Sequence, residues 1–280
     1  MADRTYVLWL RKNGSVRMHD GIDIGVWPFT DSKGQVSLFP GPLLLSNEGQ
    51  TVQVTFKNNM NEHTFHFHGI DADTPNDGVP ETYPVVDTYT FLTDHAGTYW
   101  YHCHANTVLH QQMGMYGPFV VLPADGSNRA WTDGPGFAKQ YAWILSEFDS
   151  AWRLNNPKPN FAYFNPDYFL INGKDGFDPV SAADTAITCS TGDTVLLRLI
   201  HAGYLVAQVS LGGLPFSVVA SDGRPLPVPE SPQVLEMASG ERYDLLLTPT
   251  VPGTYPVRVD YLDWYTRAVR GSARTTVTVL

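Results

Sequence analysis

The chain has 280 residues, which is enough for one large domain or two of ordinary size. Its formal net charge of −10, with no run of more than two basic residues, argues against nucleic acid or an anionic membrane surface as a partner. No apolar stretch approaches the roughly 18 residues of a membrane-spanning helix. Glycine and proline are numerous, with 24 and 21 residues, and only 16% of residues are charged, a composition that favours short strands joined by turns.

The two cysteines, Cys103 and Cys189, are too few for a disulfide framework. Cys103 lies inside a cluster of histidines, whereas Cys189 lies in an apolar segment of the second half. We expect both to be reduced, Cys103 as a metal ligand and Cys189 as a small core residue. The first residues lead directly into strand-like sequence, so we expect no signal peptide in this sequence.

Strand-like segments follow one another closely through the first half of the chain. Residues 51–56 alternate between polar and apolar side chains, which is the two-residue period of a strand. Helical periodicity is weak apart from a short turn near residues 106–112. The expected strands are residues 4–10, 51–56, 63–68, 87–92, 98–104 and 117–122, with a long loop at 71–84. Their spacing predicts a β-sandwich.

A polar, turn-rich segment from residue 123 to 136 is expected to join this sandwich to a second one. Segments of the two halves match in order, 48–54 with 191–197 and 96–99 with 252–255, which indicates an internal duplication. The sequence therefore predicts an all-β chain of two tandem Greek-key β-sandwich domains, residues 1–125 and 126–280. The strands expected in the second domain are residues 140–148, 168–171, 185–189, 194–200, 216–220, 233–237, 243–248, 255–260 and 275–280.

Seven of the nine histidines lie between residues 63 and 110. Successive residues of a strand point to opposite faces, so His66 and His68 share one face and His63 points the other way. By the same rule His102 and His104 share a face, and Cys103 between them points away. The candidate ligands therefore separate into an inner group and an outer group. The inner group is His63, Cys103, His110 and Met115; the outer group is His66, His68, His102 and His104.

The inner group combines two imidazoles, one thiolate and one thioether. This ligand set is typical of a blue-copper electron-transfer site, in which a weak axial methionine tunes the reduction potential. A bound metal would also keep the thiol of Cys103 deprotonated. The outer group offers four neutral imidazoles, which suit copper and are poor ligands for magnesium or calcium. Because Cys103 is covalently joined to His102 and His104, the backbone provides a short electron path between the groups.

The remaining candidates have ordinary structural interpretations. His95 lies in a turn, His19 lies in a polar segment, and His201 ends a strand that we expect to be buried. Met113 competes with Met115 for the axial position, and we favour Met115 because a spacing of five after the histidine is common in such loops.

Several motifs resemble those of the multicopper oxidase family of cupredoxin-domain proteins, which includes the laccases. In the first half these are His66-Phe-His68-Gly69, Asp77-Gly-Val-Pro80 and Gly97-Thr-Tyr-Trp-Tyr-His102. In the second half, 198–203 and 240–244 resemble the copper-free middle domain of three-domain laccases. The resemblance covers nearly the whole chain and implies that both sandwiches are cupredoxin-like.

The resemblance also implies a function. A mononuclear type 1 copper, held by the inner group, would accept electrons one at a time from a reductant. Electrons would pass through Cys103 and its flanking histidines to a type 2/type 3 trinuclear copper cluster, where dioxygen becomes water. Cys103, His102 and His104 would thus be catalytic, and Asp77 matches an acidic position that helps to deliver protons. Such proteins are periplasmic or secreted.

The chain departs from the family pattern in three ways. The type 1 features lie in the first domain, as in two-domain oxidases and copper nitrite reductases. The segment from Cys103 to His110 is longer than in laccases and shorter than in nitrite reductases, so the reduction potential is open. Most importantly, a trinuclear cluster needs about eight histidines from two domains, and the second domain offers only His201. Where a copper-binding second domain would carry His-x-His, this chain reads 211–216, Leu-Gly-Gly-Leu-Pro-Phe.

Three arrangements could complete the outer group: a third cupredoxin domain, a second copy of the first domain in a homo-oligomer (trimeric or dimer-based), or a single copper completed by a neighbour or by water. We therefore expect a laccase-type oxidase whose partners are dioxygen and a phenol, an aromatic amine or a low-valent metal ion. The alternatives are a copper nitrite reductase and a non-enzymatic blue-copper electron-transfer or copper-binding module.

Overall fold

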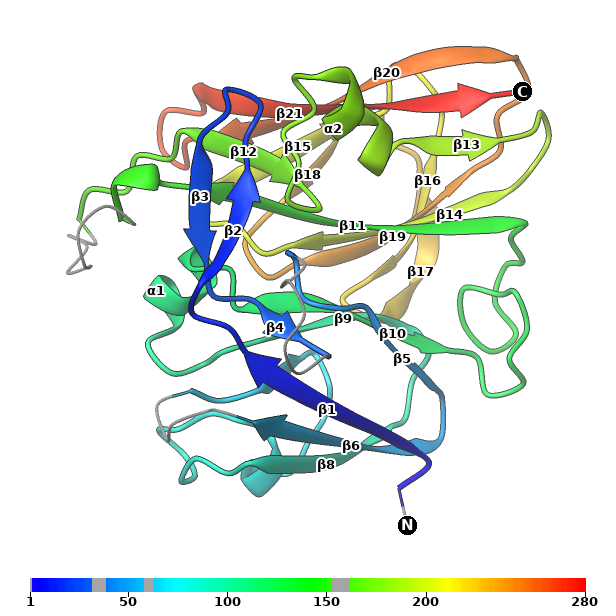
Figure 1. The fold of residues 1–280 in the computed structure, drawn as a ribbon. Helices are drawn as coiled ribbons and strands as arrows, with labels where there is room; N and C mark the ends of the chain where they lie inside the picture. Colours follow the sequence, from blue (N-terminus) through cyan, green and yellow to red (C-terminus); the bar gives the residue numbers. More distant parts are fainter. Residues whose placement is uncertain (1, 32–38, 58–62, 153–161) are drawn as a thin grey trace. The chain divides into compact units, whose positions relative to one another are not determined.

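A computed structural model describes residues 2–31, 39–57, 63–152 and 162–280 (Figure 1). As the sequence predicts, the fold is all-β, with only short helices among the described residues. The chain forms two compact units. The first comprises residues 1–16, 25–135 and 222–224, and the second comprises 17–24, 136–221 and 225–280. No helix in the described part of the chain is both long and apolar enough to cross a membrane.

The first unit is a sandwich of two four-stranded sheets. One sheet has the order β4-β1-β6-β8, in which β1 runs parallel to β6. The other has the order β5-β10-β9-β7, in which β9 pairs antiparallel with both neighbours. The strands are β1 (Arg4–Leu10), β4 (Phe29–Thr30), β5 (Leu44–Asn47), β6 (Gln50–Lys57), β7 (His66–His68), β8 (Thr88–Thr93), β9 (Gly97–His102) and β10 (Tyr116–Leu122).

Alternation of side chains explains how these strands build the core. On β6, Val52, Val54 and Phe56 are buried, and the residues between them are partly exposed. β9 is different because all six of its residues are buried, although it carries polar residues. A strand that is buried on both faces can place ligands toward the core from one face and toward a second site from the other. Candidate ligands cluster at the end of this strand.

The second unit is a sandwich of a six-stranded sheet, β12-β11-β14-β19-β16-β17, and a five-stranded sheet, β13-β21-β20-β15-β18. Cys189 is buried in its apolar core. The strands are β11 (Lys139–Phe148), β12 (Tyr168–Ile171), β13 (Ile187–Cys189), β14 (Val195–His201), β15 (Val206–Ser210), β16 (Ser217–Ser221), β17 (Arg224–Glu230), β18 (Leu235–Met237), β19 (Arg242–Leu247), β20 (Gly253–Leu262) and β21 (Val269–Val279). A separate hairpin pairs β2 (Gly14–Arg17) with β3 (Asp23–Val26).

The strands expected from sequence are present with small shifts of their ends, but several elements were not predicted. β17 carries three prolines, which cannot donate ladder hydrogen bonds, and it lies at the edge of its sheet, where such residues are tolerated. Helix α2 (Pro179–Thr185) begins after Asp178, whose side chain accepts hydrogen bonds from the backbone N–H groups of Val180 and Ser181. Helix α1 (Thr107–Gln112) occupies the predicted helical turn, and two 3₁₀ turns span Thr74–Asn76 and Ser150–Trp152.

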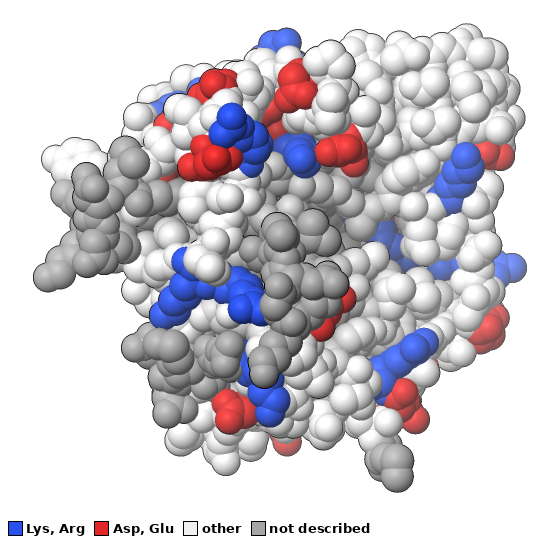
Figure 2. Space-filling model, viewed as in Figure 1, with Lys and Arg blue, Asp and Glu red and all other residues white. Residues whose placement is uncertain are grey.

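The surface carries few charges. On the face shown in Figure 2, basic and acidic side chains occur singly or in small mixed groups, and uncharged residues cover most of the described surface.

Candidate metal centre

The inner group comes together at the end of the β7–β9 sheet. The Sγ atom of Cys103 lies 3.2 Å from Nδ1 of His110 and 3.8 Å from Nδ1 of His63. The two imidazole rings lie 4.5 Å apart, and all three residues are buried. Metal–sulfur and metal–nitrogen bonds of roughly 2.3 and 2.0 Å place such donors roughly 3.3–3.8 Å apart in trigonal or tetrahedral sites. The spacing therefore fits one metal ion.

Backbone hydrogen bonds hold these ligands in place. His102 pairs with His66 in the antiparallel ladder of β9 and β7, so Cys103 follows directly from the last paired residue. Helix α1 then returns the chain, and His110 occupies its last turn. The N–H of Cys103 donates to the carbonyl of Met115, and the N–H of Met115 donates to the carbonyl of His110, at 3.1 and 3.0 Å. One short loop therefore fixes three of the four predicted inner ligands.

Met115 is fully buried in the same core cluster as Cys103. Met113, its competitor for the axial position, caps the C-terminal end of α1 and accepts a hydrogen bond at its carbonyl from the N–H of Trp27. The direct backbone links of Met115 to Cys103 and His110 favour Met115, in agreement with the sequence-based choice.

Burial favours the uncharged forms of His63 and Cys103 in the absence of metal. Burial lowers the pKa of His63 to about 3, with smaller contributions from the charges of His110 and Lys12. Burial also raises the pKa of the Cys103 thiol, although hydrogen bonds from Thr64 partly oppose this. A metal ion entering the site must therefore displace the thiol proton of Cys103, whereas His63 carries no imidazolium proton to displace.

The outer group lies on the other side of Cys103. Ligand nitrogens of His66, His68 and His102 lie within 4.8 Å of one another. The closest pair is His68 Nδ1 and His102 Nε2, at 3.3 Å. His104 adjoins this set, with its ring 5.1 Å from that of His66 and 5.7 Å from that of His102. The structure thus brings all four predicted histidines together.

Hydrogen bonds leave defined ring nitrogens available for metal. His102 Nδ1 lies 3.0 Å from the carbonyl of Cys103, and His66 Nδ1 lies 2.7 Å from the carbonyl of Asp77. Each Nδ1–H can donate to its carbonyl and leave Nε2 unprotonated, which is the usual support of a metal-bound imidazole. Burial lowers the pKa of both imidazoles, and for His66 this effect outweighs the opposing charge of Asp77. Neutral imidazoles are the form that binds metal.

Two carboxylates flank the outer group. An Oδ1 of Asp77 lies 3.1 Å from His66 Nδ1, which places the predicted acidic residue beside the histidines. Glu81, which the sequence analysis did not single out, lies with Oε2 at 3.8 Å from His104 Nδ1 and is largely exposed.

Trp100 was also missed: its ring lies 5.1 Å from that of His68 and 4.5 Å from that of His102. Strand parity could have found it, because Trp100 precedes His102 by two residues.

The other histidines have structural roles. His201 is fully buried; its Nε2 lies 2.7 Å from the carbonyl of Leu205, and its Nδ1 accepts a hydrogen bond from the N–H of Gly203. His19 pairs with the carboxylate of Asp175, and His95 lies near Asp94 at the surface. Both cysteines are free thiols. These placements agree with the ordinary interpretations drawn from sequence.

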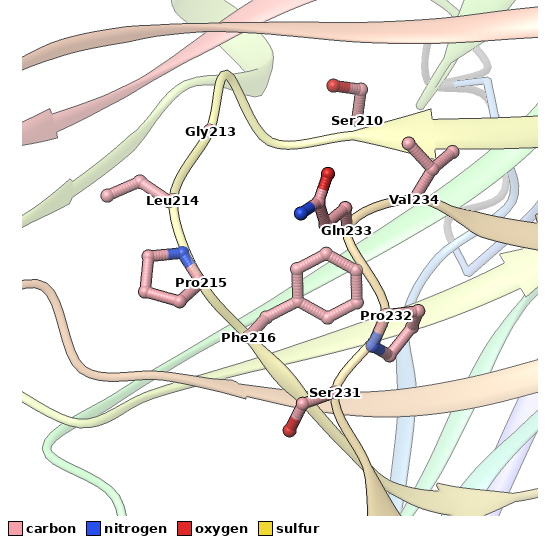
Figure 3. Close-up of a pocket in the computed structure, with 9 residues that line it drawn as sticks. All are labelled: Ser210, Gly213, Leu214, Pro215, Phe216, Ser231, Pro232, Gln233 and Val234. Atoms are coloured by element: carbon pink, nitrogen blue, oxygen red, sulfur yellow. The ribbon is translucent and has the colours of Figure 1, made fainter.

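The second unit has a hollow where a copper-binding domain would carry His-x-His. Figure 3 shows this cavity, of about 460 Å³, with Phe216 and Gln233 among its lining side chains. The nine lining residues in Figure 3 include no histidine, cysteine or carboxylate. Among the described residues of this unit, none therefore offers a replacement for the missing ligands at this place.

Comparison with known proteins agrees with the geometry. The first half, residues 34–126, and the second half, residues 147–280, each match a family model described as multicopper oxidase. The chain belongs to the multicopper oxidase family. Copper is accordingly the cofactor that this family implies for the two histidine groups, and the cupredoxin-type fold expected from the motifs is confirmed.

Related proteins carry several names. Copper resistance protein A of Escherichia coli is 40% identical over 271 residues, covering 75% of this chain and 42% of that protein. Multicopper oxidase MmcO of Mycobacterium tuberculosis is 27% identical, covering 84% of this chain and 51% of that protein. The chain thus spans about two fifths to one half of these curated relatives.

Solved structures of similar length also match. The blue copper oxidase of Nitrosomonas europaea superposes with a TM-score of 0.82 at 28% identity, covering 99% of this chain and 86% of the other. The copper nitrite reductase of the same organism has a TM-score of 0.76 at 24% identity, which is a likeness of fold.

Proposed function

We propose that the protein is a copper-dependent oxidase of laccase type, which passes electrons from a phenol, an aromatic amine or a low-valent metal ion to dioxygen. The observation that carries this proposal is the junction of the two groups. Cys103 of the inner group is bonded through the backbone to His102 and His104 of the outer group, and the ring of His102 lies against that of His66 at 5.0 Å. A shared peptide segment is a short route for electrons.

Copper supplies one-electron transfer at the inner group and reduction of dioxygen to water at the outer group. The residues provide binding, orientation and protons. His63, Cys103, His110 and Met115 bind the type 1 copper in a buried pocket, which excludes water from the thiolate. His66, His68, His102 and His104 contribute half of a type 2/type 3 cluster.

Asp77 is proposed to assist proton delivery at the outer group. Its carbonyl orients the ring of His66, and its carboxylate lies next to the same ring with the side chain about one-third exposed (32%). A carboxylate that contacts both solvent and the site can carry protons from bulk water toward bound oxygen.

The ligands of the outer group from this chain are too few for a trinuclear cluster, so we propose that they are completed from elsewhere. A second copy of the first domain in a homo-oligomer would supply four more histidines through a symmetric contact. A further cupredoxin domain is the other source, and the greater length of the curated relatives is consistent with it. We propose residues 1–125 and 126–280 as the functional domains, in a periplasmic or secreted protein.

One observation favours a second candidate. Ligand nitrogens of three outer histidines, His66, His68 and His102, lie within 4.8 Å of one another, so the outer group could hold a single copper ion. That arrangement would suit a copper nitrite reductase or, if the outer copper is labile, an electron-transfer module.

Copper counting in the purified, copper-loaded protein discriminates these functions. Elemental analysis should give more than two copper ions per chain for the shared cluster, about two for a nitrite reductase and about one for an electron carrier. Oxygen consumption with hydroquinone and no nitric oxide from nitrite would support the oxidase. Nitric oxide formation without oxygen consumption would refute it.

A further inference from the structure

An indole ring adjoins one ligand of the inner group. Trp27 follows β3 directly in the chain, and its ring centroid is 6.0 Å from that of His110. The backbone N–H of Trp27 donates a hydrogen bond to the carbonyl of Met113 at 2.6 Å. This bond fixes Trp27 against the loop that carries His110. The side chain of Trp27 is half-buried, so part of the indole reaches solvent while His110 itself is buried.

A cation lies over this indole. The ammonium of Lys12 is 5.4 Å from the centroid of the Trp27 ring, within the range of a cation–π contact. Lys12 is exposed. The chain as a whole carries a formal charge of −10, so the sign at this place is opposite to that of the whole protein.

We propose that Lys12 and Trp27 form the docking edge for the reductant and select aromatic donors that carry a negative charge. This inference rests on the proposed function and names its substrate class. The ring of the donor lies against the exposed part of the indole, and its anionic group faces the ammonium of Lys12. Cationic donors, such as divalent metal ions, are disfavoured at the same edge by charge repulsion.

The reaction at this edge is a one-electron oxidation. A hydroquinone donor loses one electron and one phenolic proton to become a semiquinone radical. A Cu(II) ion held by His63, Cys103, His110 and Met115 would accept this electron, and the phenolic proton would pass to water. Trp27 provides the contact between the donor and His110, and no covalent bond forms.

The test follows the loss of the blue absorption by stopped flow without oxygen, so that dioxygen cannot reoxidise the copper. Hydroquinone sulfonate is compared with neutral hydroquinone, and ferrocyanide with hexaammineruthenium(II). The preference is the ratio of the reduction rate with the anionic donor to that with the other donor of the pair. Lys12→Gln should lower this ratio roughly three- to tenfold, and Lys12→Glu should lower it roughly ten- to a hundredfold. These factors are expected for a change of one and two charges in partly screened solvent. Lys139→Glu on β11 is the matched control, and it should leave both ratios unchanged.

The outcomes separate this inference from the proposed function. Equal ratios in wild type, Lys12→Gln and Lys12→Glu, with the blue absorption intact, would overturn the docking edge and leave the oxidase proposal standing. Absence of a blue absorption in the copper-loaded wild type would refute the proposed function itself. If Lys139→Glu changes the ratios as much as Lys12→Glu, the selectivity arises from total charge and the inference is wrong.

A binding measurement without turnover tests the role of Trp27. In the metal-free protein, the indole N–H signal of Trp27, assigned from Trp27→Phe, should shift during titration with benzenesulfonate and not with benzyltrimethylammonium. Lys12→Gln should reduce that shift. In the copper-loaded protein, Trp27→Leu should slow reduction by both hydroquinones, and Trp27→Phe should restore most of the rate. No shift in the wild type, or equal shifts with both ions, would contradict the proposal.

Discussion

Cys103 is the residue on which both groups depend. Its sulfur lies 3.2 and 3.8 Å from two imidazole nitrogens, and its peptide group continues into the outer histidines on either side. In addition, the backbone N–H of Thr64 points to the sulfur at 3.5 Å. N–H groups directed at a thiolate stabilise its negative charge, and they influence the reduction potential of a copper site.

Replacing this sulfur tests the inner group. Cys103→Ser should abolish the intense blue absorption of the copper-loaded protein, because a serine hydroxyl does not provide the copper–thiolate bond. Cys189→Ser is the matched control: it should keep the absorption, although a hydroxyl in the apolar core costs about 1–3 kcal/mol of stability. Full absorption in Cys103→Ser, measured by visible spectroscopy, would refute the type 1 assignment.

At the scale of elements, the loop after β7 holds the outer group together. Gly78 has φ +72°, and a Cβ added there would lie 2.3 Å from the carbonyl oxygen of Phe65. The preceding residue, Asp77, provides the carbonyl that faces His66. The close approach of the two backbones therefore positions a carbonyl beside a metal-binding imidazole, and only glycine fits at this point.

Gly78→Ala should consequently destabilise the protein and weaken metal binding at the outer group. The left-handed backbone costs about 1–2 kcal/mol with alanine, and the steric overlap adds about 1–3 kcal/mol. Gly49→Ala is the control, because Gly49 has φ +84° but no atom within 4 Å of an added Cβ. Urea unfolding and cobalt titration of the metal-free variants measure the two effects. Equal losses in the two variants would show that the contact with Phe65 is unimportant.

In the second unit, strand β11 carries a buried glutamate. Glu147 is fully buried, and its Oε1 accepts hydrogen bonds from the N–H groups of Tyr204 and Leu205. Burial raises its pKa from 4.5 to about 7, although these hydrogen bonds oppose the shift. Between pH 4.5 and about 7, the folded state therefore binds more protons than the unfolded state. The stabilising contribution of protonated Glu147 is complete below pH 4.5 and is lost as the pH rises through about 7.

Glu147→Gln removes this titration. The unfolding free energy of the variant, relative to wild type, should rise by about 3 kcal/mol from pH 4.5 to pH 7. The buried histidines have lowered pKa values, which make the unfolding free energy rise with pH in both proteins. Subtracting the wild-type value from that of the variant at each pH cancels this contribution. Exposed Glu236→Gln, the control, should show no such trend in urea unfolding. A constant difference across this pH range would contradict the raised pKa of Glu147.

At the scale of the molecule, the missing ligands link activity to assembly. If a second copy completes the cluster, dilution should dissociate the oligomer and lower the copper content and the oxygen consumption together, while the blue absorption per chain persists. Analytical ultracentrifugation and elemental analysis over the same concentrations measure this. A monomer that retains more than two copper ions at every concentration would exclude completion by another copy.

The all-β class, most of the strands of both units and the separation of the candidate ligands into two clusters could be predicted from sequence. Two-residue alternation is a local property, so it is visible in the chain itself. His63 precedes β7, and Cys103 and His104 follow β9, so these three residues lie outside the strands. The alternation of side chains between the two faces therefore persists in the segments just beyond the strands. The structure gathers His63, Cys103 and His110 in one cluster and His66, His68 and His102 in another, as this alternation predicts, and their role as metal ligands stays a prediction.

The proline-rich edge strand β17 escaped prediction, because its position at the rim of a sheet depends on residues far away in the chain.

By itself, the sequence determined which atoms are available: one thiolate and a set of imidazoles at fixed spacing, with too few histidines in the second half for a complete cluster. Only the tertiary structure decided which nitrogen of His66 and His102 is left available for a metal, because the carbonyls of Asp77 and Cys103 hold the other one. It also placed Lys12 and Trp27 beside His110, although more than eighty residues separate them along the chain. Residue order sets which ligands are available, whereas the selectivity proposed for Lys12 and Trp27 depends on contacts that form only on folding.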